Sequence, residues 1–172
     1  EKNGTEVDFG SRVGRIADLK DGEQRYLAFL QAQAESLSGM KIVLDCANGA
    51  VYRVGVPLFS SLGAEVSAIG VSPDGMNIND GCGSEHPGAL IEAVLQQGAD
   101  LGLAFDGDGD RLLAVDETGA PVTGDQIVAV CAADMKTRQA LSNNRVVTTV
   151  MSNIGLGRAL RQLGIEHRQS AV

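Results

Sequence analysis

Three aspartates alternate with two glycines in residues 105–111, which read Phe-Asp-Gly-Asp-Gly-Asp-Arg. Glycine lets the chain curl without side-chain clashes, so Asp106, Asp108 and Asp110 can converge on one centre. Three carboxylates that close repel one another unless a cation neutralises them, and hard oxygen ligands select Mg²⁺ or Ca²⁺ over softer metals. The run therefore predicts a site for a divalent cation.

Arg111 follows the third aspartate directly. A guanidinium beside a cation site indicates that an anionic ligand shares the site, most simply a phosphate, which arginine can bind through two hydrogen bonds. A metal ion together with an arginine is the equipment of phosphoryl transfer. We therefore assign Arg111 a candidate catalytic role.

Two other interpretations of the run stay open at this point. Asp-Gly pairs are common in hairpin turns, so the run could be an acidic surface turn. An EF-hand calcium loop would have Asp106, Asp108 and Asp110 at its first, third and fifth positions and Glu117 at its twelfth. Arg111 stands where that loop needs glycine, and the flanks have the pattern of strands where it needs helices, which argues against calcium sensing.

The charge balance limits the partners that the chain can bind. The 172 residues include 14 Lys and Arg against 22 Asp and Glu, a net charge of −8. This charge argues against a nucleic-acid or acidic-lipid surface, so a phosphate must be held by a local feature. Since no run approaches the roughly 18 to 20 apolar residues of a membrane helix and the N-terminus has no apolar signal region, we expect a soluble, cytoplasmic protein without a nucleic-acid or membrane partner.

Short apolar runs alternate with helical patterns along most of the chain, and apolar residues make up 44% of it. The patterns predict helices over 23–37, 54–62, 89–97, 125–140 and 155–163, strands over 41–44, 65–69, 100–105 and 145–150, a hairpin over 112–115 and 121–123, and a long loop over 72–87. This order predicts an α/β fold with a layered, mostly parallel but mixed sheet and helices on both faces. The aspartate run follows a buried strand, and open α/β sheets bind ligands at the carboxyl ends of their strands.

The same patterns divide the chain into three parts. Residues 1–38 hold a polar connector, residues 1–22, and one helix; residues 39–141 form a complete α/β domain; residues 142–172 begin a further strand and helix without closing a layer. We therefore expect the chain to be the central piece of a larger protein, with its second part the domain that carries the aspartate run.

Several motifs together resemble a known family. Residues 104–111 resemble the metal-binding loop of the α-D-phosphohexomutases, and the second part of the chain then resembles domain II of that family. The supporting matches, in the family's order, are residues 45–50 (DCANGA), 62–66 (LGAEV), 124–126 (GDQ) and 151–153 (MSN). The loop over residues 77–84 (NINDGCGS) resembles the phosphoglucosamine mutase branch of the family.

The resemblance implies a four-domain enzyme, of which residues 1–38 would be the end of the first domain, residues 39–141 the second and residues 142–172 the start of the third. A phosphoserine of the first domain phosphorylates glucosamine 6-phosphate, giving a bisphosphate that returns its other phosphate to the serine. Glucosamine 1-phosphate, a precursor for cell-wall synthesis, is the product. Asp106, Asp108 and Asp110 would hold Mg²⁺ and Arg111 would assist at the phosphate. The family's serine loop is not among these 172 residues, so we expect the chain alone to be inactive towards a hexosamine phosphate. A phosphoglucomutase or phosphomannomutase of the same family, or a non-catalytic cation-binding module, remains the alternative.

Overall fold

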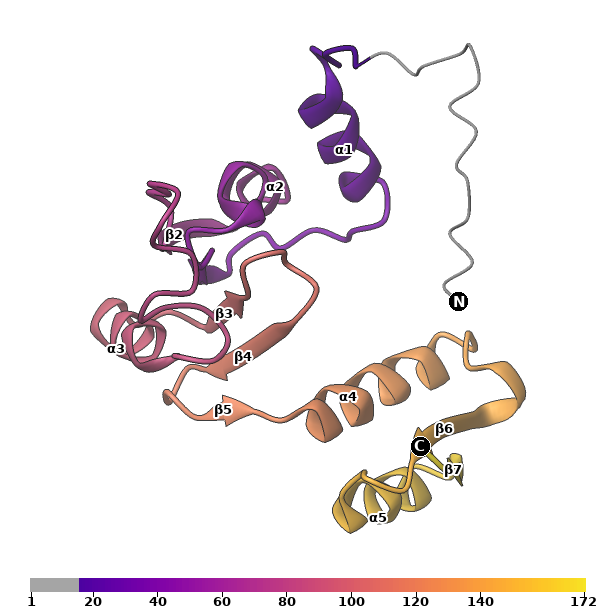
Figure 1. Ribbon diagram of the computed structural model, residues 1–172. Helices are drawn as coiled ribbons and strands as arrows, with labels where there is room; N and C mark the ends of the chain where they lie inside the picture. The colour runs from indigo at the N-terminus through magenta and orange to yellow at the C-terminus, as the bar shows by residue number, and fades with distance from the viewer. Residues whose placement is uncertain (1–15) are drawn as a thin grey trace, which may run out of the picture.

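The structure is a computed structural model that describes residues 16–172 (Figure 1). Most of the predicted connector, residues 1–15, lies outside the described part. Within the described part the chain forms two sheets, a five-stranded and a two-stranded one. None of the described helices is long and apolar enough to cross a membrane.

The five-stranded sheet is mixed, as predicted. Its strands are β1 (Lys41–Asp45), β2 (Glu65–Ile69), β3 (Leu101–Phe105), β4 (Leu112–Asp116) and β5 (Pro121–Val122). The spatial order is β2-β1-β3-β4-β5, in which β2, β1 and β3 are parallel and β4 and β5 add an antiparallel hairpin. The carboxyl ends of the three parallel strands therefore lie at the same edge of the sheet.

Alternating side chains of β1 face opposite layers, which places helices on both faces. Ile42 and Leu44 belong to a buried cluster against which Phe59 of α2 (Gly55–Ser61) packs. Val43, between them, belongs to a second cluster with Leu90 of α3 (Gly88–Gln97). This is the two-sided burial that the continuous apolar run of a central parallel strand predicts, and Figure 1 shows α2 and α3 on either side of the strands.

The remaining elements form a second unit. It consists of α4 (Gly124–Thr137), the short 3₁₀ helix η2 (Ser142–Asn144), β6 (Arg145–Thr149), α5 (Ile154–Gln162) and β7 (Glu166–Ser170). Its buried cluster joins Ala132 of α4 to Leu156 and Leu160 of α5 and to Ile165. Because α4 packs in this cluster, we propose to place the boundary between the units at the β5–α4 junction and not between residues 141 and 142.

Two elements differ from the predictions. Helix α1 spans Gly22–Gln31 and ends before the predicted limit at residue 37, because Leu37 packs against the sheet core and its backbone N–H donates to the carbonyl of Leu62 at 2.8 Å. Strand β7 was not predicted, since its residues Glu-His-Arg-Gln-Ser lack both apolar alternation and β-branched side chains. It forms by parallel pairing with β6 after α5 returns the chain.

Candidate metal and phosphate site

Three loops meet at the carboxyl edge of the parallel strands. Residues 46–50 follow β1, residues 70–87 follow β2 and lead to the start of α3, and residues 106–111 connect β3 to the antiparallel β4. The central position of β1 between β2 and β3 brings these loops together, although they are far apart in the sequence. This edge is where an open α/β sheet places its ligands.

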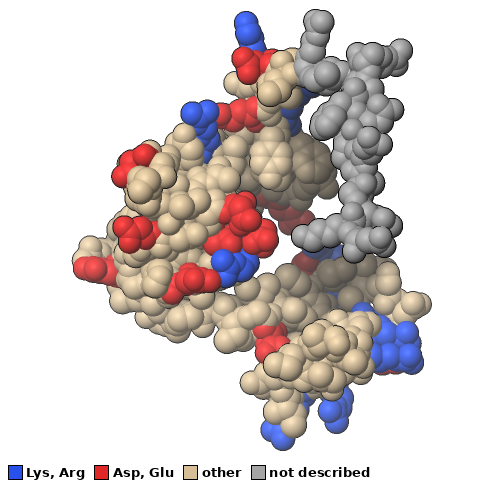
Figure 2. Space-filling model, in the orientation of Figure 1, with Lys and Arg blue, Asp and Glu red and all other residues tan. Residues whose placement is uncertain are grey.

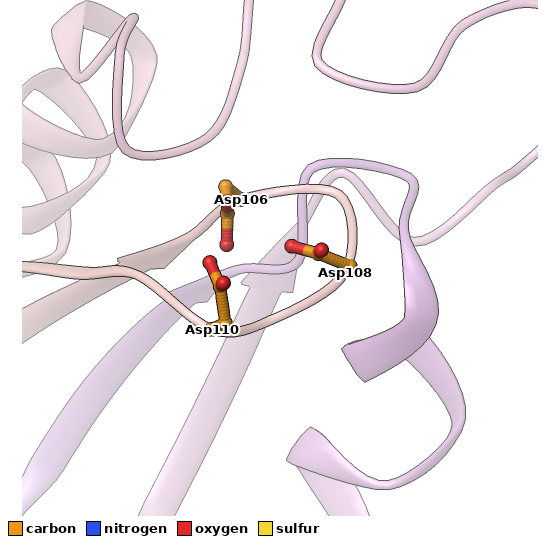
Figure 3. A group of neighbouring side chains, drawn as sticks. All are labelled: Asp106, Asp108 and Asp110. Atoms are coloured by element: carbon orange, nitrogen blue, oxygen red, sulfur yellow. The ribbon is translucent and has the colours of Figure 1, made fainter.

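The predicted aspartates converge in the third loop. The carboxylate oxygens of Asp106, Asp108 and Asp110 lie within 4.8 Å of one another, and Figure 3 shows the three carboxyl groups pointing towards a common space. Asp106 is buried with 4% exposure, whereas Asp108 and Asp110 are exposed. A backbone hydrogen bond from Gly109 to the carbonyl of Asp106, at 3.1 Å, closes the turn, and Gly109 adopts a φ of +77° there.

Arg111 wraps around the buried carboxylate. Its backbone N–H donates to Oδ1 of Asp106 at 3.0 Å, and its Nε–H donates to Oδ2 at 2.8 Å. The backbone hydrogen bond first, and the guanidinium hydrogen bond second, lower the pKa of Asp106 to about 2. Asp106 is therefore a carboxylate at every physiological pH.

Repulsion dominates at the third aspartate. The negative charge of Asp108, followed by that of Asp106, raises the pKa of Asp110 above its ordinary value. The guanidinium of Arg111 offsets this only in part, since its Nε lies 3.9 Å from Oδ1 of Asp110. The two carboxylates of Asp108 and Asp110 thus carry charge that a cation would relieve.

The first loop, residues 46–50, packs against the backbone of the aspartate loop. The backbone N–H of Ala50 donates to the carbonyl of Gly107 at 2.8 Å. Gly49 lies so close to the same peptide that a Cβ placed on it would be 2.2 Å from the carbonyl oxygen of Gly107. Only glycine permits this approach, so Gly49 and the hydrogen bond of Ala50 hold the first loop close to the backbone of the aspartate loop.

A second buried carboxylate, Asp45, ties the first loop to the second. It is fully buried at the end of β1, and its Oδ2 accepts the backbone N–H of Gly83 at 2.7 Å while Oδ1 accepts that of Ala47 at 2.9 Å. Ser84 then donates its backbone N–H to the carbonyl of Phe105, at the end of β3, at 2.9 Å. The three loops therefore form one hydrogen-bonded layer.

A cavity of about 500 Å³ opens above this layer. Its walls are Ile78 and Asn79 of the second loop and Asp106, Gly107, Asp108, Asp110 and Arg111 of the third. In Figure 2 acidic atoms with basic atoms beside them gather on the side of the first unit that faces the second unit. The cavity thus combines hard oxygen ligands with a cationic donor.

Family models match both units of the chain. The model described as phosphoglucomutase/phosphomannomutase, alpha/beta/alpha domain II, matches residues 24–119, and the model for domain III of the same family matches residues 123–172. The chain belongs to this family. The resemblance drawn from residues 104–111 is therefore confirmed at the level of the family and of the α/β fold.

Relatives of this phosphohexomutase chain are similar over nearly its full length. Phosphoglucosamine mutases of Pelotomaculum thermopropionicum and Bacillus licheniformis are 54% and 51% identical over 95% of the chain. The chain spans 37% of the length of each of these relatives. A crystal structure of a phosphoglucomutase/phosphomannomutase family protein from Burkholderia thailandensis has the same fold, with a TM-score of 0.74 and 24% identity over 87% of this chain and 33% of that one.

The donor set of the phosphohexomutase loop fits the Mg²⁺ that the family implies. Three carboxylates with converging oxygens match the preference of a hard cation, and a bound cation would offset the repulsion from Asp108 and Asp106 that raises the pKa of Asp110. The EF-hand interpretation does not fit, because β3 and β4 flank the loop and no helix does. The aspartates also form more than a surface turn, since Asp106 is buried and hydrogen-bonded to Arg111.

Some residues of this site were not singled out from the sequence. Glu85 carries no recognisable sequence signal, yet it accepts a hydrogen bond from Nη1 of Arg111 at 2.6 Å. Asp45 stood only as part of a matched motif, and it proves to be the buried acceptor that joins two loops. An aspartate as the last residue of an apolar strand, with Asn48-Gly49 three residues further on, is the signal from which its supporting role follows.

Proposed function

We propose that this chain is part of an enzyme that interconverts glucosamine 6-phosphate and glucosamine 1-phosphate through a phosphoserine and a bisphosphate intermediate. The observation that carries the proposal is the convergence of Asp106, Asp108 and Asp110 beside Arg111 in one cavity. The names of the relatives, phosphoglucosamine mutases, support the hexosamine as the substrate.

The three aspartates would hold Mg²⁺ through their carboxylate oxygens. The bound cation would neutralise charge on a phosphoryl group in transfer. Arg111 would bind the phosphate directly, because its guanidinium lines the cavity and presents N–H donors that match phosphate oxygens. Its pKa is raised by the hydrogen bond to Glu85 and then by that to Asp106, so the donor stays cationic during turnover.

The loop over residues 77–84 supports the choice of sugar. It contributes Ile78 and Asn79 to the wall of the cavity that the aspartate loop also lines. We assign the hexosamine preference to this loop because its residues resemble the phosphoglucosamine mutase branch. A phosphoglucomutase or phosphomannomutase activity is the second candidate, favoured by the description of the family models.

The chain alone is proposed to be inactive and to supply the Mg²⁺ loop. In the family pattern the nucleophilic serine lies in the first domain. The family model for domain II matches residues 24–119 of this chain, and the model for domain III matches residues 123–172. The phosphosugar would contact this chain together with the other domains. We propose a cytoplasmic location for this reaction.

The test is an assay of the full protein with glucosamine 6-phosphate, glucose 6-phosphate and mannose 6-phosphate in the presence of Mg²⁺. We expect preference for the glucosamine phosphate and loss of activity in Asp108→Ala. Glu117→Gln is the control, because it removes one negative charge just past the far end of β4, a five-residue strand about 16 Å long that begins at the aspartate loop. If all three sugars are inert with the serine intact, the chain is a non-catalytic cation-binding module instead.

A further inference from the structure

Arg111 is held from two sides by carboxylates of different loops. On the inner side its Nε donates to Oδ2 of the buried Asp106 at 2.8 Å. On the outer side its Nη1 donates to Oε1 of Glu85 at 2.6 Å. Two hydrogen bonds from two edges of a planar group define the orientation of its plane, which a single contact cannot do.

Glu85 comes from a rigidly anchored segment. The residue before it, Ser84, donates its backbone N–H to Phe105 at 2.9 Å, and Gly83 donates to the buried Asp45 at 2.7 Å. Gly83 has a φ of +80° and no room for a Cβ, which would lie 2.7 Å from the carbonyl oxygen of Phe105. The backbone that carries Glu85 is therefore tied to the ends of β1 and β3, the same strands that position the site.

Stability does not account for this ion pair. The side chains of Arg111 and Glu85 are 58% and 65% exposed, and exposed ion pairs contribute little to folding. The pair instead consumes one donor of a group that lines the ligand cavity. A guanidinium has five N–H donors, of which these two contacts use two, so three remain for an anion.

We propose that Glu85 is a positioning residue, which orients the guanidinium of Arg111 so that its remaining donors face the phosphate of the substrate. Glu85 itself does not contact the reacting atoms in this proposal; it acts through Arg111. The identity of the anion as a sugar phosphate rests on the proposed function, whereas the orientation of Arg111 by Glu85 does not.

The experiment compares Glu85→Ala, Glu85→Gln and the control Glu117→Gln in the full protein. The first readout is the Nε–H signal of Arg111 in a ¹H–¹⁵N spectrum, assigned by its loss in Arg111→Lys. The second is kcat and KM for glucosamine 6-phosphate, with the Mg²⁺ concentration for half-maximal activity and the thermal midpoint measured alongside. Binding of inorganic phosphate is measured on the same variants.

We expect Glu85→Ala to shift or broaden the Arg111 signal and to lower kcat/KM and the affinity for phosphate about tenfold, the size expected for one charge-assisted hydrogen bond. Glu85→Gln keeps an oxygen acceptor on a side chain of the same length, so we expect it to retain most of the wild-type kcat/KM and phosphate affinity. The thermal midpoint and the Mg²⁺ requirement should stay unchanged in both variants. An unchanged Arg111 signal, or kcat/KM and phosphate affinity equal to wild type in Glu85→Ala, would overturn the proposal. So would a loss in Glu85→Gln as large as that in Glu85→Ala.

The failure of this proposal and of the proposed function are distinguishable. If no sugar phosphate is converted by the wild-type protein, the function fails, and the Arg111 signal and phosphate affinity still decide the role of Glu85. If Asp108→Ala is inactive and Glu85→Ala matches wild type in every readout, the function stands and the positioning role is refuted.

Discussion

Gly49→Ala tests whether the first loop sets the position of the metal ligands. A Cβ on Gly49 would lie 2.2 Å from the carbonyl oxygen of Gly107, about 0.8 Å closer than the 3.0 Å below which real Cβ contacts essentially do not occur. The obstacle is the backbone of Gly107, so the first loop and the aspartate loop must move apart by roughly this amount. Overpacking of this kind costs about 1–3 kcal/mol in stability.

The effect of Gly49→Ala on activity should be larger than its effect on the free energy of unfolding. A displacement of roughly 1 Å at a catalytic group lowers activity by about 100-fold, because binding sites require their ligands within about 0.5 Å. We therefore expect Gly49→Ala to weaken Mg²⁺ binding strongly, so that activity needs a much higher Mg²⁺ concentration, and to lower the thermal midpoint only moderately. Mg²⁺ titration by activity and by calorimetry, together with thermal unfolding, measures both effects.

Gly88→Ala is the matched control for Gly49→Ala. Gly88 is the first residue of α3, and a Cβ there meets nothing within 4 Å. The control should keep the wild-type Mg²⁺ requirement and gain a little stability, since alanine favours helix over glycine by up to about 1 kcal/mol. If Gly49→Ala binds Mg²⁺ with wild-type affinity, the steric reasoning about the first loop is wrong.

Three further predictions concern the site and the core. Asp108→Asn should lower the pKa of Asp110 towards its ordinary value, because the charge of Asp108 is the main cause of its elevation. A carboxyl ¹³C titration of the metal-free protein measures this pKa, and an unchanged value would contradict the prediction. Asp106 has a folded pKa of about 2 against an ordinary 3.8, so its ionised form stabilises the fold above about pH 4. This contribution is lost as the pH falls towards 2. The free energy of unfolding in urea should therefore decline less steeply across that range for Asp106→Asn than for wild type. Leu90→Ala, at a fully buried position, should cost about 2–5 kcal/mol in urea unfolding, whereas Leu95→Ala, at a 54% exposed position on the same helix, should cost far less.

The predicted elements that the structure reproduces best are those whose burial leaves a periodic signal. Val43 and its neighbours form an unbroken apolar run, and α3 places Leu90 and Val94 on one face, so both were predictable from the sequence. Strand β7 carries no such signal, because four of its five residues are exposed and it exists only through pairing with β6. The end of α1 differs from the prediction for a related reason: Leu37 continues the helical spacing but packs against the sheet core.

The residues of the site also differ in whether the local sequence predicts their position. Asp106, Asp108 and Asp110 lie within one turn, so their convergence follows from the glycines between them and from the buried strand before them. The partner of Arg111 does not follow in this way, because Glu85 is 26 residues distant and reaches Arg111 only through the order β2-β1-β3 at the sheet edge. Ligands of one loop can therefore be predicted from spacing alone, whereas the groups that orient them depend on which strands are neighbours. Substitution of Glu85 therefore tests the neighbour relation of the strands more directly than substitution of an aspartate in the 106–111 loop does.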